Sequence, residues 1–141
     1  MSEIKVDTLT GKTTANDITV TVGATATMSL EQGLMKVWCA YDSQAQVIDG
    51  SLNASSLTDN AQGDTTITHT STFSAVSEVC FAGITSDDNS SNKHVAQISF
   101  ARIGSTPFTT TTVRVSTNFD GQQTVLEDMD FIHIHGLGGL A

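Results

Sequence analysis

The sequence predicts an all-β protein, an antiparallel β-sandwich of jelly-roll-like type preceded by a short N-terminal β segment. Ser and Thr make up roughly a quarter of the 141 residues, and Pro107 is the only proline. Threonine is β-branched and fits half-exposed strand positions, so threonine-rich alternating runs favour sheet. Polar turns separate these runs at intervals of roughly 8–15 residues, a spacing typical of antiparallel sandwiches.

Two parts are expected along the chain, an N-terminal segment over residues 1–33 and a β-sandwich domain over residues 34–141. The first part contains two short alternating runs that predict strands. The apolar residues of these runs are Ile4, Val6, Ile18, Val20 and Val22. Two short strands bury too little surface to be stable alone. They must therefore lie against the rest of the chain, against copies of the chain or against another protein.

Residues 24–35 are the one candidate for a helix, of a turn or two at most. Ser29 can cap it, and Leu30 and Leu34 are four residues apart. Gly33 weakens the prediction, because glycine costs about 1 kcal/mol inside a helix. We interpret this stretch as the hinge between the two parts.

The predicted sandwich is built around Trp38, which we expect to be the largest core anchor because large aromatic side chains bury the most area. A polar turn over residues 58–64 supplies the side chains and the glycine that tight turns need. The predicted strands are Met35–Tyr41, Ala45–Asp49, Ser51–Leu57, Thr65–Thr70, Val76–Gly83, His94–Arg102, Thr111–Ser116 and Phe131–Gly136.

The charge balance excludes several classes of partner. Six Lys and Arg face fifteen Asp and Glu, for a net charge of −9. A nucleic-acid binder needs a basic stripe, so we expect no nucleic-acid binding. Anionic membrane surfaces are disfavoured for the same reason. The balance suits a surface that meets other proteins or neutral sugars.

The N-terminus has no apolar stretch of the kind that directs secretion, and no run approaches the ~20 apolar residues of a membrane span. We therefore expect a protein made in the cytoplasm and not secreted. Cys39 and Cys80 both lie in apolar strand-like runs. We expect two buried thiols that act as small hydrophobic residues, with a disulfide between two strands as the alternative.

The run Phe131–Gly136 alternates isoleucine with histidine. On a strand, Ile132 and Ile134 would enter the core while His133 and His135 project outward together. Two imidazoles are too few for a closed metal site. Surface or interface histidines are the plainer interpretation, and three copies around a threefold axis would bring six imidazoles together.

No arrangement of residues selects an enzyme, and we expect no catalysis. Glu127, Asp128 and Asp130 form a short acidic stretch, which we interpret as a solvated turn because neither calcium-loop spacing nor a facing carboxylate is present. Tyr41, Phe108 and Phe119 lie next to turns. They could contact a sugar or receptor, or they could pack in the core or at its rim.

One stretch resembles a known family. Lys36, Trp38, Tyr41 and Asp42 are followed by a second cluster of motif residues, and together they are similar to a module common in tail-fibre and other virion proteins of marine tailed bacteriophages. That second cluster is Asn53, Ser55, Ser56, Leu57, Thr58, Asp59, Asn60, Gly63 and Asp64. The opening residues 2–10 also resemble the N-termini of such proteins. Ala61 departs from the pattern, which usually has glycine there.

The resemblance implies a virion structural protein whose N-terminal segment attaches to the particle and whose sandwich is displayed outward. A short tail fibre or receptor-binding tip is the first expectation; a capsid decoration or head-fibre protein, and a free carbohydrate-binding sandwich, are the alternatives. Charged residues are only 15%, so little keeps the sheets of neighbouring copies apart, and we expect a homotrimer. The expected partners are copies of the chain, other virion proteins and a host surface glycan. Trimeric iron sites built from His-x-His pairs occur in phage fibre tips and spikes. The resemblance therefore also implies that a trimer of this chain could bind iron through His133 and His135.

Overall fold

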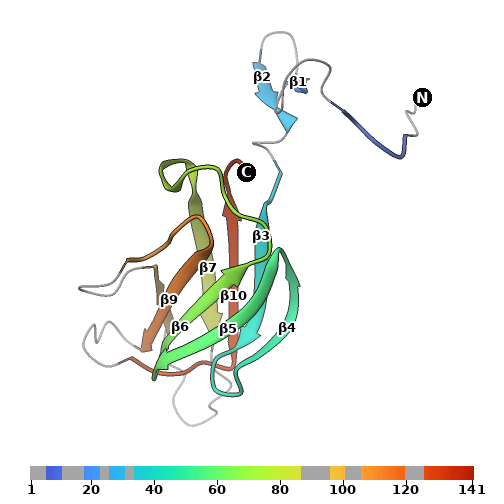
Figure 1. The fold of residues 1–141 in the computed structure, drawn as a ribbon. Coiled ribbons are helices and arrows are strands. Elements are labelled where there is room, and N and C mark those ends of the chain that lie inside the picture. Colours follow the sequence, from blue (N-terminus) through green and yellow to red (C-terminus); the bar gives the residue numbers. More distant parts are fainter. Residues whose placement is uncertain are drawn as a thin grey trace. The chain divides into compact units, whose positions relative to one another are not determined.

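The structure is a computed structural model that describes residues 6–10, 18–22, 26–30, 34–86, 96–100, 106–119 and 126–141. Contacts between residues divide the chain into two compact units, Met1–Leu34 and Met35–Ala141. The boundary lies one residue later than the sequence predicts. In Figure 1 the strands of each unit form their own sheets.

The first unit contains an antiparallel pair of short strands, β1 (Thr19–Val22) and β2 (Ala26–Ser29), in which Val20 lies opposite Met28. Strand β1 falls where the second run of the N-terminal segment predicts a strand. The prediction of a helix is wrong for residues 26–29, because a helix of a turn or two is costly to nucleate and pairing with β1 satisfies the same backbone groups. Leu30 is helical, whereas Leu34 and Met35 are not. Residues 24, 25 and 31–33 of the predicted helix lie outside the described residues.

The first predicted strand of the N-terminal segment is not present over the residues that the structure describes there. Residues 6–8 are not in a strand, and Val6 is exposed. A strand this short needs a neighbour to pair with, and β1 pairs with β2 instead. Ile4 lies outside the described residues.

The second unit is an antiparallel β-sandwich, which confirms the predicted fold class. Its described residues form eight strands in two sheets, of order β4-β3-β10-β7 and β5-β6-β9-β8. The strands are β3 (Val37–Asp42), β4 (Val47–Leu52), β5 (Ala54–Ala61), β6 (Asp64–His69), β7 (Cys80–Ser86), β8 (Ala96–Ser99), β9 (Thr112–Phe119) and β10 (Phe131–Leu137). A short 3-10 helix, Val76–Glu78, precedes β7 where the sequence predicted the start of that strand. Among the described residues, no helix is long and apolar enough to cross a membrane.

The two sheets are linked along one side by a sharp corner. Strand β4 ends at Leu52 and β5 begins at Ala54, so Asn53 alone turns the chain from one sheet into the other. Asn53 does so with a φ of 59°, a left-handed conformation that asparagine tolerates better than most residues. Its side chain holds the corner by accepting a hydrogen bond from the Ser71 N–H (2.5 Å) and donating one to the Ser71 carbonyl (3.1 Å).

The turn between β5 and β6 is tighter than predicted. Strand β5 continues to Ala61 and β6 starts at Asp64, so only Gln62 and Gly63 lie between the strands. Gly63 has a φ of 62°, and a Cβ placed on it would lie 2.5 Å from the Glu127 nitrogen. The turn therefore requires glycine for both its conformation and its close approach to the segment before β10.

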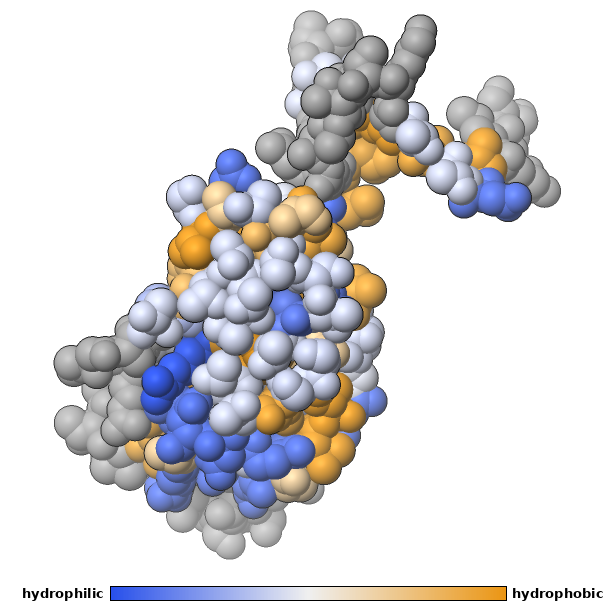
Figure 2. All heavy atoms as spheres, in the orientation of Figure 1, coloured by the Kyte–Doolittle hydropathy of each residue, from blue (hydrophilic) through white to orange (hydrophobic). Residues whose placement is uncertain are grey.

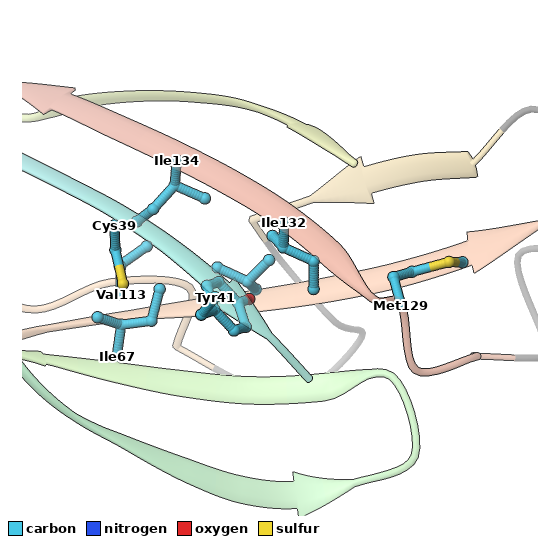
Figure 3. Packing of buried hydrophobic residues seen from close by; sticks show 8 residues of the cluster. Cys39, Tyr41, Ile67, Val113, Met129, Ile132 and Ile134 are labelled. Carbon is cyan, nitrogen blue, oxygen red and sulfur yellow. The ribbon is translucent and has the colours of Figure 1, made fainter. Parts of the chain in front are cut away.

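The core lies between the sheets and receives alternate residues of each strand. In β3 and β10 the side chains of Cys39, Tyr41, Ile132 and Ile134 point inward, as Figure 3 shows. The opposite sheet contributes buried residues of β6 and β9, and the segment before β10 closes one end. These residues are Ile67, Val113, Val115 and Met129.

Trp38 is not the core anchor that the sequence predicted. It is 38% exposed, whereas its neighbours Val37 and Cys39 are at most 1% exposed. Successive side chains of a strand point to opposite faces, so Val37, Cys39 and Tyr41 enter the core and Trp38 must point outward. Tyr41, 1% exposed, fills the position expected of Trp38.

Replacing Ile134 by alanine should lower the free energy of unfolding by about 2–4 kcal/mol, because the side chain is 2% exposed and its loss leaves a cavity. In protein dilute enough to remain unassembled, Ile84→Ala is a matched control, because Ile84 is 72% exposed in the single chain and the change should cost less than about 1 kcal/mol. Urea unfolding of both variants measures the difference. Equal losses would contradict the assignment of the two faces.

Candidate functional site

The outer face of the sheet β4-β3-β10-β7 is apolar. Strand register places one set of alternate residues from all four strands on it, with His133 between Ala40 and Ile84, and His135 between Trp38 and Ala82. We call this surface the apolar face. Its members are Val47, Gly50, Leu52, Trp38, Ala40, Asp42, Phe131, His133, His135, Leu137, Cys80, Ala82, Ile84 and Ser86.

The large side chains of the apolar face are exposed to solvent. Ile84 is 72% exposed, Phe131 49%, Leu52 48% and Leu137 40%. The ring of Trp38 lies across Gly50 of the neighbouring strand, since a Cβ on Gly50 would lie 3.1 Å from the ring atom Cη2. A contiguous exposed patch of this kind is typical of a surface that another molecule covers.

The outer face of the other sheet is polar. Its outward positions include Ser56, Thr58, Thr66, Thr68 and Arg114. Figure 2 shows the side of the molecule on which β5 and β6 lie in front, and the surface there is mostly pale or blue. The sandwich therefore has one ordinary solvent-facing sheet and one that is apolar on both sides.

The alternation predicted for Phe131–Gly136 is confirmed. Ile132 and Ile134 are buried, and His133 and His135 are exposed on the apolar face. Among the described residues of a single chain, no group of three or more His, Cys, Asp or Glu is placed to hold a metal ion. Iron binding by several copies stays a prediction.

The three aromatic residues predicted as a sugar or receptor contact do not form one surface. Tyr41 is 1% exposed inside the core, so that prediction is wrong for Tyr41. Burial raises the pKa of its hydroxyl. Phe108 is half-buried and packs on Phe81, with ring centroids 5.8 Å apart. Phe119 ends β9, and its side chain lies outside what the structure describes.

The two cysteines are free and differ in exposure. Cys39 is buried as expected, and desolvation raises the pKa of its thiol to about 11. Cys80 is exposed on the apolar face, so the prediction that it is buried is wrong. The apolar run around Cys80 suggested burial, but alternation turns Cys80, Ala82 and Ile84 outward and Phe81 inward.

Polar residues at positions 53–64 help to hold the sandwich together. Asp64 is fully buried and accepts two hydrogen bonds from Arg114, from Nε to Oδ1 at 2.7 Å and from Nη2 to Oδ2 at 2.6 Å. Asn60 donates to the Thr66 hydroxyl at 2.8 Å, and Ser55 donates to the Thr68 carbonyl at 3.1 Å. These bonds tie β5, β6 and β9 to one another.

The acidic stretch before β10 also serves the structure. The Asp128 carboxylate accepts a hydrogen bond from the Gly63 N–H at 2.7 Å, and the Glu127 carboxylate accepts one from the Gln62 amide at 2.5 Å. Each bond joins positions 65 residues apart in the sequence. The stretch is therefore the anchor of the β5–β6 turn, a role that sequence reasoning missed because the two segments are distant along the chain.

His69 lies inside an aromatic cluster at the end of β6. It is 5% exposed, stacks on Phe81 with an interplanar angle of 13°, and meets the edge of Phe73 at 5.3 Å. Burial lowers the pKa of His69, and the Asn53 backbone offsets only part of this effect. The folded state therefore favours the neutral imidazole more than the unfolded chain does.

Comparison of the chain with known proteins found no match. No family model matches the chain, and neither the curated proteins nor the solved structures contain a match. The apolar face, the sandwich and the pattern of structural hydrogen bonds are thus the basis for assigning a function.

The free energy of unfolding should fall as the pH drops, because the pKa of His69 is lower in the folded state than in the unfolded chain. Below about pH 6.5 the unfolded chain binds the proton more readily, so the contribution of His69 to stability is complete only above that pH. Unfolding of the wild type and of His69→Phe between about pH 7.5 and 5 should give a steeper loss for the wild type. Parallel pH profiles would contradict this expectation.

Replacing Arg114 by methionine should destabilise the fold by about 2–4 kcal/mol, because the buried Asp64 carboxylate would lose its charged partner. Asp59→Asn, at an exposed position of the same hairpin, is the control and should change stability by less than about 0.5 kcal/mol. Thermal and urea unfolding measure both variants. A loss of unfolding free energy no larger than that of the control would contradict a structural role for the Asp64–Arg114 pair.

Proposed function

We propose that this chain is a structural protein of a tailed-phage virion and acts by assembling, as a homotrimer, into the particle. The observation that carries the proposal is the use of its virion-like residues. The side chains of Asn53, Asn60 and Asp64 form hydrogen bonds within the fold. They stabilise, respectively, the corner, the hairpin and the contact between β6 and β9. A module whose polar residues build the scaffold is suited to a mechanical role.

The division of the chain into two units supports an assignment of separate roles to them. The N-terminal unit, with β1 and β2, is the attachment segment, and Ile18 and Val20 are half-buried members of it. The sandwich is the displayed part. A short tail fibre or receptor-binding tip is the first assignment, and a capsid decoration or head-fibre protein is the alternative.

A free carbohydrate-binding sandwich is the weaker alternative. Tyr41, one of the three aromatic residues that could have stacked on a sugar, lies in the core. A glycan array probed with dispersed protein tests this alternative, and binding by a monomer would favour it over the virion assignment.

Antibody labelling of purified virions should place the protein on the particle. Negative-stain images should show label on the tail for a fibre and on the head for a decoration protein. Label on the head would exclude the fibre assignment, and particles without label would overturn the proposal. Light scattering should give the purified chain a mass of three times 14.8 kDa.

A further inference from the structure

We infer that copies of this chain meet through the apolar face, so that the outer face of β4-β3-β10-β7 is the contact surface of the assembly. The inference rests on the proposed function, since it names the surface that self-assembly would use. It commits to a second copy of the chain as the occupant of the face. Ile84, Trp38 and Phe131 would be buried in the contact, around His133 and His135 in the middle of the face.

The composition of the face is that of an interface core. The fully buried centre of a protein–protein interface is depleted of charge and enriched in Trp and Phe, and its rim is polar. The apolar face has Trp38 and Phe131, and its single charged member is Asp42. Asp42 is the last residue of β3, and its carboxylate accepts hydrogen bonds from the N–H groups of Gln44 and Ala45 at 2.7 and 2.8 Å.

The charge of the chain argues for a copy as the partner. With a net charge of −9, two copies repel one another wherever their acidic surfaces meet. They can approach closely only through a surface nearly free of charge, and the apolar face is such a surface. A basic partner would instead be drawn to the acidic residues, and only Asp42 lies on this face.

The histidines fit contact with a copy as well. A neutral imidazole has one donor and one acceptor nitrogen, so His133 and His135 of two copies could satisfy each other where an apolar partner could not. Each histidine has one small cross-strand neighbour, Ala40 beside His133 and Ala82 beside His135, and one large neighbour on its other side. Both imidazoles remain exposed on the face.

The size of the face is consistent with this role. Four strands about 4.8 Å apart, rising about 3.4 Å per residue, span roughly 400 Å² of sheet plane. A stable interface buries about 800 Å² on each partner. Side chains add to the plane, and the turns that surround the sheet supply the rim. The face is thus large enough to be the centre of the contact.

Ile84→Asp tests the inference, because it places a carboxylate at the most exposed apolar position of the face. Thr58→Asp, on the polar outer face of the other sheet, is the matched control. Analytical ultracentrifugation over a range of concentrations should show the wild type and Thr58→Asp assembling alike. Ile84→Asp should need at least about tenfold more protein to assemble, with an unchanged circular dichroism spectrum.

Thiol labelling gives a second measurement that needs no destabilising change. Cys80 is exposed on the apolar face and Cys39 is buried, so a maleimide reagent should react with Cys80 in dilute protein. The reaction should slow several-fold at concentrations where the chain assembles, while Cys39 stays unreactive at both. In the variant Cys80→Ser with Thr58→Cys, the thiol on the opposite face should react at the same rate throughout.

Two results would overturn the inference: assembly of Ile84→Asp at wild-type concentrations with Cys80 still reactive, or a wild type that stays monomeric throughout. Neither result decides whether the protein is in the virion, because antibody labelling of particles measures that separately. Label on virions combined with a reactive Cys80 in the assembled protein would keep the proposed function and remove this contact surface.

Discussion

The two-residue period of strand β10 is the constraint on which the rest of the structure depends. This strand lies between β3 and β7, so its inward residues must fill the sandwich and its outward residues form the middle of the apolar face. Ile132 and Ile134 do the first, and His133 and His135 do the second. A shift of one residue in register would exchange the two sets and bury both imidazoles without partners.

The sandwich is asymmetric because its two sheets are stabilised differently. The sheet β5-β6-β9-β8 joins its strands with polar bonds on the outside, including the Asp64–Arg114 pair and the bond from Asn60 to Thr66. The outward side chains of the sheet β4-β3-β10-β7 are mostly apolar, with little such bonding. These outer side chains stabilise the protein through the hydrophobic effect only when another molecule excludes water from them. Function and stability are therefore linked on that sheet.

Several features of the fold could be predicted from the sequence because they are local. Threonine-rich alternation indicated sheet throughout, and the isoleucine–histidine run fixed the faces of β10 without any tertiary information. The inward face of the run Val37–Tyr41 was harder to predict, since both sets of alternate residues are apolar and the size of Trp38 favoured the wrong set. The residues at positions 37, 39 and 41 are all apolar, whereas the other set ends in Asp42, and this difference indicates the inward face correctly.

One remaining error came from a contact between distant segments, since the anchoring of Gly63 by Asp128 depends on where the chain returns in space. The other was local, because the residues interpreted as a helix pair with the preceding strand β1. The apolar face itself joins four strands from residues 37 to 137, so no single run of sequence displays it.

The positions of β3 and β10 determine how the sandwich responds to mechanical force. The first residue of β3, Val37, pairs with Gly136 near the end of β10, and the Lys36 N–H donates to the Gly136 carbonyl at 2.9 Å. Pulling on the two ends of this unit would open the β3–β10 ladder from one end, breaking its hydrogen bonds in succession. Since each bond adds only about 1 kcal/mol, little force would be needed. The sandwich would therefore resist tension poorly when it is pulled between these two ends.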